Sequence, residues 1–583
     1  MVTEAHGVAG ALSAAGVGRG DPVAVAHAAG VGVALVAPTG LAVSTGDEEA
    51  AEAVRRVEDE LRPRWVWWSG DTAAALVASG TRVAACWDIA AVHRLVFGGW
   101  RADPGRVWAT LQGLPLAGLP ATRGQPDLFS SLDDDGGSAD EPVRPDGHLR
   151  PDWAGGGWSA SPERLVRWAE LAAEVARRQQ ARIAAMADHA RLAATARVES
   201  AAELLCAEMS ADGLPLDRAA AEAIIGGFVG PRPRTEREAA EQRGRRDAEV
   251  LRHAPAGSDF DLRSPGQVKS LLRRIGVEVP DTRAWRLEAR RDEHPLVDAL
   301  LTWRKAERVA TTFGYGWLDE HLGGDGRLRG EWSGSDGAAG RMTASAGLHN
   351  MPADLRGGVA AEDGHVLVRA DLGQIEPRVL AAVSGDRDLA RATAEDDMYS
   401  PVARQLDVDR ATAKVAVLGA MYGQTTGHGA HALRRLQMAY PVAMAYLDDA
   451  DRAGQTSRDL RTYGGRLIPM GSTNANEVSD TVARSRAAAR GRYGRNAMVQ
   501  GAAAELFKLW AVTVRARGAA LDARIVLCLH DELLVHTPVE HGEVVARLLD
   551  DCLQEAAHRW APDRSVRFVA DISVLRRWSE AKD

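Results

Sequence analysis

The stretch from Val366 to Asp386, VLVRADLGQIEPRVLAAVSGD, constrains the fold of this chain more than any other. Its first five residues are mostly apolar and β-branched, which predicts a strand, and from Gln374 to Ser384 apolar residues recur at helical spacing. Asp371 therefore falls at a strand-to-helix junction, where a carboxylate can reach a metal ion without being buried. An Asp at such a junction is often a helix N-cap instead. This residue alone leaves both roles open.

The length and charge of the chain limit the classes of protein to which it can belong. With 583 residues it is too long for one hydrophobic core, which predicts several domains. The net charge of −9 argues against a uniformly basic nucleic-acid-binding protein, although local arginine clusters can still bind nucleic acid. The four cysteines form no Cys-x-x-Cys pair, and no apolar stretch reaches the length of a membrane helix. A reducing cytoplasm is the expected location.

The residue pattern changes along the chain and predicts an order of domains. Residues 1 to about 120 alternate short apolar runs, such as Gly32 to Val36 and Val83 to Ala85, with helical stretches, which predicts a small α/β domain. Residues from about 121 to 161 are rich in Gly, Pro and Asp and predict a mobile linker or long loop. Helical patterns follow from Pro162 to about Val250, from Ser264 to Trp317 and from about Leu389 to Arg515.

A second acidic residue occurs in a similar setting near the end of the chain. Arg524 to Cys528 is an apolar strand, and Leu533 to His536 is apolar again after the triplet His530-Asp531-Glu532. This pattern predicts a hairpin with carboxylates at its tip. Two carboxylates such as Asp371 and Asp531 can share two Mg²⁺ ions about 3.5 to 4 Å apart, an arrangement that serves phosphoryl transfer.

The predicted helix RATAKVAVLGAMYG places four side chains on one face. Arg410, Lys414, Leu418 and Tyr422 follow one another at intervals of four, which forms a slowly drifting stripe at 3.6 residues per turn. Two cations followed by an apolar and an aromatic residue suit a ligand with a polyphosphate at one end and a ring at the other. The alternative is an amphipathic surface helix whose basic residues face solvent.

Several motifs resemble those of DNA polymerase family A, the polymerase I or Klenow-like family. DLGQIEPR from Asp371, RATAKVAVLGAMYG from Arg410 and LHDEL from Leu529 are similar to its three polymerase motifs. Supporting matches are GRMTA from Gly340, LHNMP from Leu348, TYGGR from Thr462 and NAMVQGAAAE from Asn496. The resemblance extends from about Ala201 to the end of the chain, with all motifs in the same order.

The resemblance implies roles for individual residues. Asp371 and Asp531 match the metal-binding aspartates, Glu532 an auxiliary carboxylate, and Lys414 a cation of both the catalytic site and the triphosphate site. The implied dNTP-binding residues are Arg410, Lys414, Leu418, Tyr422, Gln374 and Glu376, of which Glu376 matches the residue that excludes ribonucleotides. The implied contacts with the primer-template duplex, largely in the minor groove, are Arg341, Asn350, Asn496, Gln500 and His530.

The sequence also departs from the family pattern. Leu418 replaces an aromatic residue that packs on the incoming nucleotide, and Leu372 and Gly373 replace the usual Tyr and Ser. Tyr399 stands where His is common, and Pro377 falls within the predicted helix. The charged residues that the chemistry needs are all present, so we expect activity with altered nucleotide packing.

The front domain resembles a ribonuclease H-like 3′–5′ exonuclease without its acidic residues. Its expected first strand, near GVGVALVAPTG, has no Asp-x-Glu, and WAELA at Trp168 to Ala172 lacks the later Asp. Asp71 and Asp88 remain, for which surface or capping roles are expected. This predicts a domain that is kept for shape and has no proofreading activity.

The predicted linker contains a candidate partner-binding peptide. Gln125, Leu128 and Phe129 in QPDLF resemble the QxxLF peptide with which bacterial polymerases bind the sliding clamp. Two apolar anchors in an acidic, mobile segment suit a groove on a partner protein. The alternative is an anchor onto the chain's own domain.

These observations together predict an α/β multidomain protein: a right-hand polymerase with palm, fingers and thumb behind a degenerate exonuclease-like domain. We expect this front domain at residues 1–190 and the polymerase at 191–583, with the thumb at about 200–320, the palm at 321–390 and 497–583, and the fingers at 391–496. The expected function is extension of a DNA primer from dNTPs with two Mg²⁺ ions, for which Mn²⁺ can substitute. The expected setting is repair or gap filling by a cytoplasmic, nucleoid-associated monomer. The alternatives are a single-subunit RNA polymerase and a catalytically silent DNA-binding scaffold tethered to the clamp.

Overall fold

The computed structural model describes residues 5–119, 138, 140–257, 260–336, 339–423, 430–471, 480–529, 531–563 and 565–581. The chain forms two compact units. The first comprises Met1–Asp212, Glu331–Ala344 and Val368–Val574, and the second Gly213–Gly330, Ser345–Leu367 and Leu575–Asp583. Within the described ranges, none of the helices is both long and apolar enough to cross a membrane.

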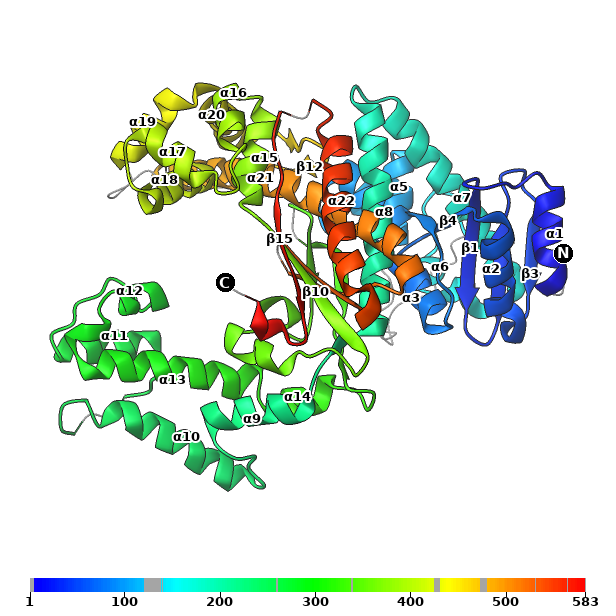
Figure 1. Ribbon diagram of the computed structural model, residues 1–583. Coiled ribbons are helices and arrows are strands. Elements are labelled where there is room, and N and C mark those ends of the chain that lie inside the picture. Colours follow the sequence, from blue (N-terminus) through cyan, green and yellow to red (C-terminus); the bar gives the residue numbers. More distant parts are fainter. Residues whose placement is uncertain are drawn as a thin grey trace. The chain divides into compact units, whose positions relative to one another are not determined.

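The predicted front α/β domain is confirmed as a five-stranded sheet of order β3-β2-β1-β4-β5 (Figure 1). Its strands are β1 (Pro22–Ala28), β2 (Gly32–Val36), β3 (Ala42–Thr45), β4 (Arg64–Trp67) and β5 (Ala85–Asp88). β2 runs antiparallel to β1 and β3, whereas β4 is parallel to both β1 and β5. The prediction of a strand at Val83 to Ala85 was wrong in position, because β5 begins only at Ala85.

Alternation along the strands builds two cores in this domain. Val23 and Val25 face the core formed with α1 (Ala5–Ala14), α2 (Asp47–Leu61) and α3 (Gly70–Ala78). Ala24 and Ala26 face the opposite core, with α4 (Ile89–Phe97), α5 (Pro104–Gln112) and α7 (Pro162–Ala184). Successive strand residues point to opposite faces, so a strand buried on both sides is apolar throughout.

Part of the predicted mobile linker or long loop, from about 121 to 161, is a loop that packs on the front domain. Residues 140–161 pack onto the front domain through the short helices α6 (Pro151–Ala154) and η2 (Gly157–Ala160). Trp153 is fully buried, and the ring of Trp158 stacks on Trp168 with 5.7 Å between centroids. Two large aromatic side chains therefore anchor a segment that its Gly, Pro and Asp content marked as a loop.

A second sheet has four strands in the order β13-β14-β10-β15. Its strands are β10 (His365–Leu372), β13 (Arg524–Leu529), β14 (Glu532–Pro538) and β15 (Ala570–Leu575). β13 and β14 form the predicted antiparallel hairpin. The predicted strand-to-helix junction is also confirmed, since β10 ends at Leu372 and α15 (Ile375–Ser384) begins three residues later.

Helices make up most of the remaining first unit, as predicted. The long α21 (Asp480–Gly518) packs against α8 (His189–Asp212), α20 (Pro441–Gln455) and α22 (Gly542–Trp560). α16 (Arg387–Ala392), α17 (Tyr399–Leu406), α18 (Arg410–Tyr422) and α19 (Ala430–Ala439) precede α20. A small hairpin that the sequence did not predict joins β11 (Leu460–Arg461) to β12 (Leu467–Ile468).

A buried charge cluster connects α8 with α21. Glu199 on α8 accepts from Lys508 on α21 at 2.8 Å and pairs with Arg466 from the β11–β12 hairpin. All three side chains are at most 3% exposed. Two buried cations thus depend on one carboxylate.

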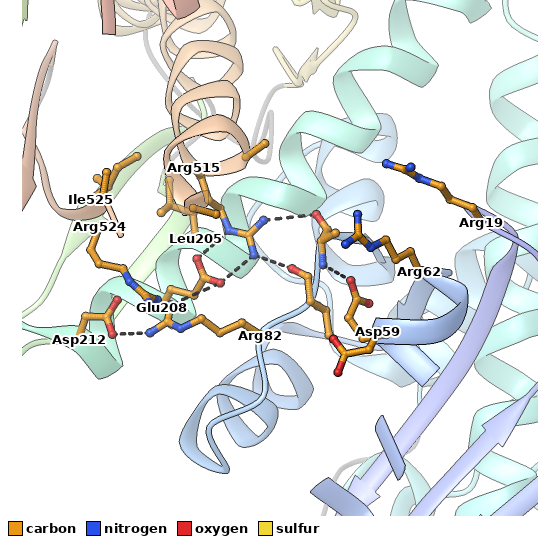
Figure 2. Close-up of a pocket in the computed structure, with 16 residues that line it drawn as sticks. Arg19, Asp59, Arg62, Arg82, Leu205, Glu208, Asp212, Arg515, Arg524 and Ile525 are labelled. Atoms are coloured by element: carbon orange, nitrogen blue, oxygen red, sulfur yellow. Dashed lines mark hydrogen bonds and ion pairs between the residues drawn. The ribbon is translucent and has the colours of Figure 1, made fainter. Parts of the chain in front are cut away.

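A cavity of about 500 Å³ separates part of the front domain from α21 (Figure 2). Arg515 on α21 lines this cavity. Its guanidinium donates to both carboxylate oxygens of Glu208 at 2.7 Å and to the Val83 carbonyl at 2.6 Å. Arg82 of the front domain pairs with Asp212 and Glu208. These ion pairs connect both the front domain and α21 to α8, and the hydrogen bond to Val83 joins α21 to the front domain directly. None of the predicted site residues that the structure describes lines the cavity.

The second unit is mainly helical, which confirms the pattern predicted there. It contains α9 (Arg218–Val229), α10 (Glu236–Leu251), α11 (Pro265–Arg274), α12 (Ala284–Glu288), α13 (Pro295–Thr312) and α14 (Tyr315–His321). Its core includes Val250, Leu271 and Leu300. The assignment of these and the preceding elements to thumb, palm and fingers stays a prediction.

Candidate active site

The structure brings Asp371 and Asp531 together. Asp371 is the second-last residue of β10, and Asp531 lies at the turn between β13 and β14. The backbone N–H of Leu372 donates to the carbonyl of Asp531 at 3.0 Å, so the two acidic residues are neighbours across adjacent strands. Asp371 is not a helix cap, because Gln374 holds the N-cap position of α15.

Burial and neighbouring carboxylates raise the proton affinity of both aspartates. Burial, together with the charge of Asp531, raises the pKa of Asp371 to about 6. Burial also raises the pKa of Asp531, to which the adjacent Glu532 charge contributes. Carboxylates that are held close in a partly desolvated site resist ionisation, and a cation among them relieves this.

Arg369 is a residue of this site that the sequence analysis missed. Its buried guanidinium donates to Asp371 at 2.7 Å, to Glu532 at 2.8 Å and to Asp571 on β15 at 3.3 Å. The sequence carries a signal for this residue, because Arg369 interrupts an apolar run two residues before Asp371. Residues two apart on a strand point to the same face of the sheet.

The junction after Asp371 explains two of the departures from the family pattern. A Cβ on Gly373 would lie 2.9 Å from the Val569 side chain, so the close approach of the segment before β15 leaves no space for a serine. Pro377 occupies the first turn of α15, where its missing N–H removes no helical hydrogen bond. Gln374 has a left-handed backbone (φ 52°), and its side-chain oxygen accepts from the Met398 N–H at 3.0 Å.

Arg378, also missed, fixes the segment between α16 and α17. Its guanidinium is fully buried and donates to five backbone carbonyls: those of Gly373, Thr393, Glu395, Asp396 and Arg567. Burial lowers the pKa of this arginine to about 10. The segment that it fixes continues directly into Asp397.

Glu376 lies at the centre of a polar cluster. Its carboxylate accepts from Arg341 at 2.8 Å and from the Tyr422 hydroxyl at 2.8 Å. The Gln500 side chain hydrogen-bonds the same tyrosine. The predicted sugar-selecting residue therefore contacts one predicted nucleotide-binding and one predicted DNA-binding residue.

The predicted stripe on α18 is confirmed as a face turned away from the core. Arg410 and Lys414 are exposed, and Leu418 and Tyr422 are half-buried. The opposite face is buried through Ala413, Ala416, Val417, Ala420 and Met421. Asp409 caps the helix by accepting from the Thr412 N–H at 2.9 Å.

Arg410 is held by a carboxylate that the sequence analysis did not identify. Asp397 accepts from Arg410 Nε at 2.7 Å and from Nη2 at 2.9 Å. The hydrogen bond with Arg410 lowers the pKa of Asp397 to about 2. The guanidinium also lies 5.8 Å from the ring centre of the buried Tyr399, the residue that replaces His.

The remaining predicted residues have different positions. Asn496 is half-buried on α21, one turn before Gln500 and on the same face. Asn350 ends a short helix of the second unit, where its carbonyl accepts from Arg308 at 2.7 Å. His530 and the candidate clamp peptide with Gln125, Leu128 and Phe129 lie outside the described residues.

The acidic side chains fit a divalent cation. Asp371, Asp531 and Glu532 offer carboxylate oxygens, which are the ligands that Mg²⁺ prefers. Burial is the largest cause of the raised pKa values of Asp371 and Asp531, and the charges of neighbouring carboxylates add to it. These residues would hold the metal.

Comparisons with known proteins bear on the family and the fold of this chain. The family model "DNA polymerase family A" matches residues 234–580. The thermostable DNA polymerase I of Thermus aquaticus is 29% identical over 425 residues, which cover 66% of this chain and 48% of the relative. DNA polymerase I of Deinococcus radiodurans is 28% identical over 383 residues, 58% of this chain and 38% of the relative. The chain thus matches less than half the length of these relatives.

A solved structure shows the same fold. The POL domain of Pol1 from M. smegmatis, in complex with DNA primer-template and dNTP, aligns with a TM-score of 0.70 at 20% identity, covering 100% of this chain and 99% of that chain. The match of the family model over residues 234–580 shows the family. The chain belongs to DNA polymerase family A.

Proposed function

We propose that the chain is a template-directed DNA polymerase that adds dNTPs to a primer 3′-hydroxyl. The observation that carries this proposal is the backbone hydrogen bond from Leu372 to Asp531, which makes Asp371 and Asp531 neighbours on adjacent strands. Glu376, five residues after Asp371, hydrogen-bonds Tyr422 and Arg341, which are a predicted nucleotide-binding and a predicted DNA-binding residue.

In the proposed reaction the carboxylates of Asp371 and Asp531 would hold two Mg²⁺ ions, with Glu532 beside them. When bound, these ions lower the pKa of the primer hydroxyl and stabilise the pyrophosphate leaving group. The polypeptide orients the reacting groups, and its fixed charges favour the transition state.

Arg410 and Lys414 bind the triphosphate. Lys414 is exposed, and within the described part of the chain no side chain pairs with it. Arg410 exchanges Asp397 for phosphate oxygens where it binds through Nε and Nη2, because that carboxylate uses both nitrogens. Bidentate phosphate binding by the same two nitrogens offsets the loss.

Glu376 and Tyr422 select the sugar. Their hydrogen bond holds the carboxylate in one orientation, and a 2′-hydroxyl would have to displace or desolvate it. We expect discrimination against ribonucleotides even though Leu418 provides no aromatic packing.

We propose that the front domain has no proofreading activity. Neither β1 nor β2 contains an acidic residue. Asp88 is fully buried, caps α4 by accepting from the Ala91 N–H at 2.8 Å and accepts from Trp67 at 2.9 Å. Asp71 is exposed and accepts from Ser69. Such surroundings support capping and surface roles. Excision of a mismatched 3′ end that is lost in Asp88→Ala would contradict this proposal.

A primer-extension assay tests the polymerase proposal against its alternatives. Wild type should extend a DNA primer with dNTPs and not with rNTPs, and Asp371→Ala should be inactive. Asp522→Ala, which removes an exposed acidic residue just before β13, is the matched control and should keep wild-type activity. Extension with rNTPs alone would favour a single-subunit RNA polymerase, and DNA binding without extension would favour a scaffold.

Clamp binding through QPDLF and a role in repair or gap filling are further parts of the proposal. Absence of proofreading and the Leu418 substitution support repair over replication. If a variant with both Leu128→Ala and Phe129→Ala binds the clamp as tightly as wild type, clamp binding through QPDLF is refuted.

A further inference from the structure

Arg369 has contacts that distinguish it from an ordinary buried arginine. Its side chain is 6% exposed, and its Nε, Nη1 and Nη2 each reach a different carboxylate, on Glu532, Asp571 and Asp371 respectively. The buried Arg378 provides the contrast, since its guanidinium binds backbone carbonyls only.

The three carboxylates are not equivalent partners. Glu532 is 5% exposed and Asp371 34%, so both contacts are formed in a partly desolvated site. Asp571 is 74% exposed, and its longer contact contributes little. The guanidinium therefore acts mainly on the metal-binding Asp371 and on Glu532.

A cation at this position has two effects on the site. Its fork fixes the orientation of Asp371 relative to Glu532, because each carboxylate accepts from a different nitrogen. Its charge also repels a divalent cation that approaches Asp371. Its Nη2 donates a hydrogen bond to one of the two carboxylate oxygens of Asp371 that could bind the cation.

We propose that Arg369 is a positioning residue that competes with the divalent cation for Asp371 and Glu532. It keeps Asp371 and Glu532 aligned before metal and nucleotide arrive, and it weakens metal binding until the triphosphate supplies further ligands. This inference rests on the proposed polymerase function. It predicts that loss of the charge tightens metal binding while loss of the fork geometry slows catalysis.

A Mn²⁺ titration, followed by electron paramagnetic resonance, tests the competition on the full chain without DNA or nucleotide. Arg369→Gln should bind Mn²⁺ at least tenfold more tightly than wild type, and Asp371→Ala should lose this site. Arg524→Gln is the control, because it removes a strand arginine that pairs with the exposed Asp522 on the same sheet. Unchanged or weaker Mn²⁺ binding in Arg369→Gln would overturn the proposal.

Arg369→Lys separates charge from geometry and keeps the test open if the Gln variant does not fold. Its Mn²⁺ affinity should stay within threefold of wild type, since the charge is kept. Its kcat at saturating metal and dNTP should fall at least tenfold, with little change in KM, since one ammonium cannot reproduce the fork. A wild-type kcat, or Mn²⁺ binding tightened tenfold, would refute the positioning role. Primer extension by wild type in the same series reports on the proposed function separately.

Discussion

Asp371→Asn should make the protein more stable at neutral pH while it removes activity. Burial and the charge of Asp531 raise the pKa of Asp371 from 3.8 to about 6, so the ionised carboxylate is unfavourable in the folded state. The folded state binds the proton more tightly than the unfolded state does. The stabilising contribution of the protonated carboxyl is thus complete below pH 3.8 and is lost as the pH rises through 6.

The shift of about 2 pKa units corresponds to about 3 kcal/mol above pH 7 for a fully desolvated group. Asp371 is 34% exposed, so solvent screening reduces this value. We expect Asp371→Asn to raise the free energy of unfolding by about 1.5 kcal/mol at pH 8, and by about half as much at pH 5. The asparagine oxygen can still accept from Arg369.

Urea unfolding of both proteins without metal, at pH 5, 6, 7 and 8, measures this difference. Asp522→Asn is the control, since that carboxylate is exposed, and its effect should stay within about 0.5 kcal/mol. An Asp371→Asn variant less stable than wild type at pH 8, or a difference that does not grow with pH, would refute the electrostatic account of this site.

Three further predictions concern other contacts. Glu376→Ala should lower the ratio of kcat/KM for dNTP over rNTP at least tenfold, because it removes the partner of Tyr422, and an unchanged ratio would argue against sugar selection there. Asp397→Asn should tighten dNTP binding up to about fivefold, since freeing Arg410 from an exposed ion pair changes the free energy by about 1 kcal/mol at most. This gain in dNTP affinity should be constant from pH 6 to 9, because the pKa of Asp397 is about 2. Weaker dNTP binding by the variant, measured by filter binding or fluorescence, would contradict the prediction. Glu199→Gln should lower the free energy of unfolding by about 3 kcal/mol, because Lys508 and Arg466 then lack their shared carboxylate; the surface variant Glu174→Gln should cost less than about 0.5 kcal/mol by the same urea assay.

Local periodicity was enough to predict the elements that hold the acidic residues. The β10–α15 junction and the β13–β14 hairpin both follow from short apolar runs and helical spacing within about 20 residues. The stripe on α18 was predictable for the same reason, since its four side chains are four residues apart.

Contacts between distant segments could not be predicted in this way. Asp397 pairs with Arg410 although helix α17 lies between them in the chain, and Arg378 reaches carbonyls up to 189 residues away. Trp153 and Trp158 hold a segment that its composition marked as a loop. Arg369 was predictable in part. Strand alternation places its side chain on the same face of the sheet as Asp371, but its contacts with Glu532 and Asp571 could not be predicted.

The central claim is that Asp371 and Asp531 form one metal-dependent catalytic site. Single-turnover incorporation of one dNTP into a primer-template, with Mg²⁺ varied, tests it most directly in wild type, Asp371→Ala, Asp531→Ala and the control Asp522→Ala. We expect Mg²⁺-dependent incorporation in wild type and in the Asp522→Ala control, and a rate at least a thousandfold lower in Asp371→Ala and in Asp531→Ala. Incorporation at the wild-type rate by either Asp371→Ala or Asp531→Ala would contradict it.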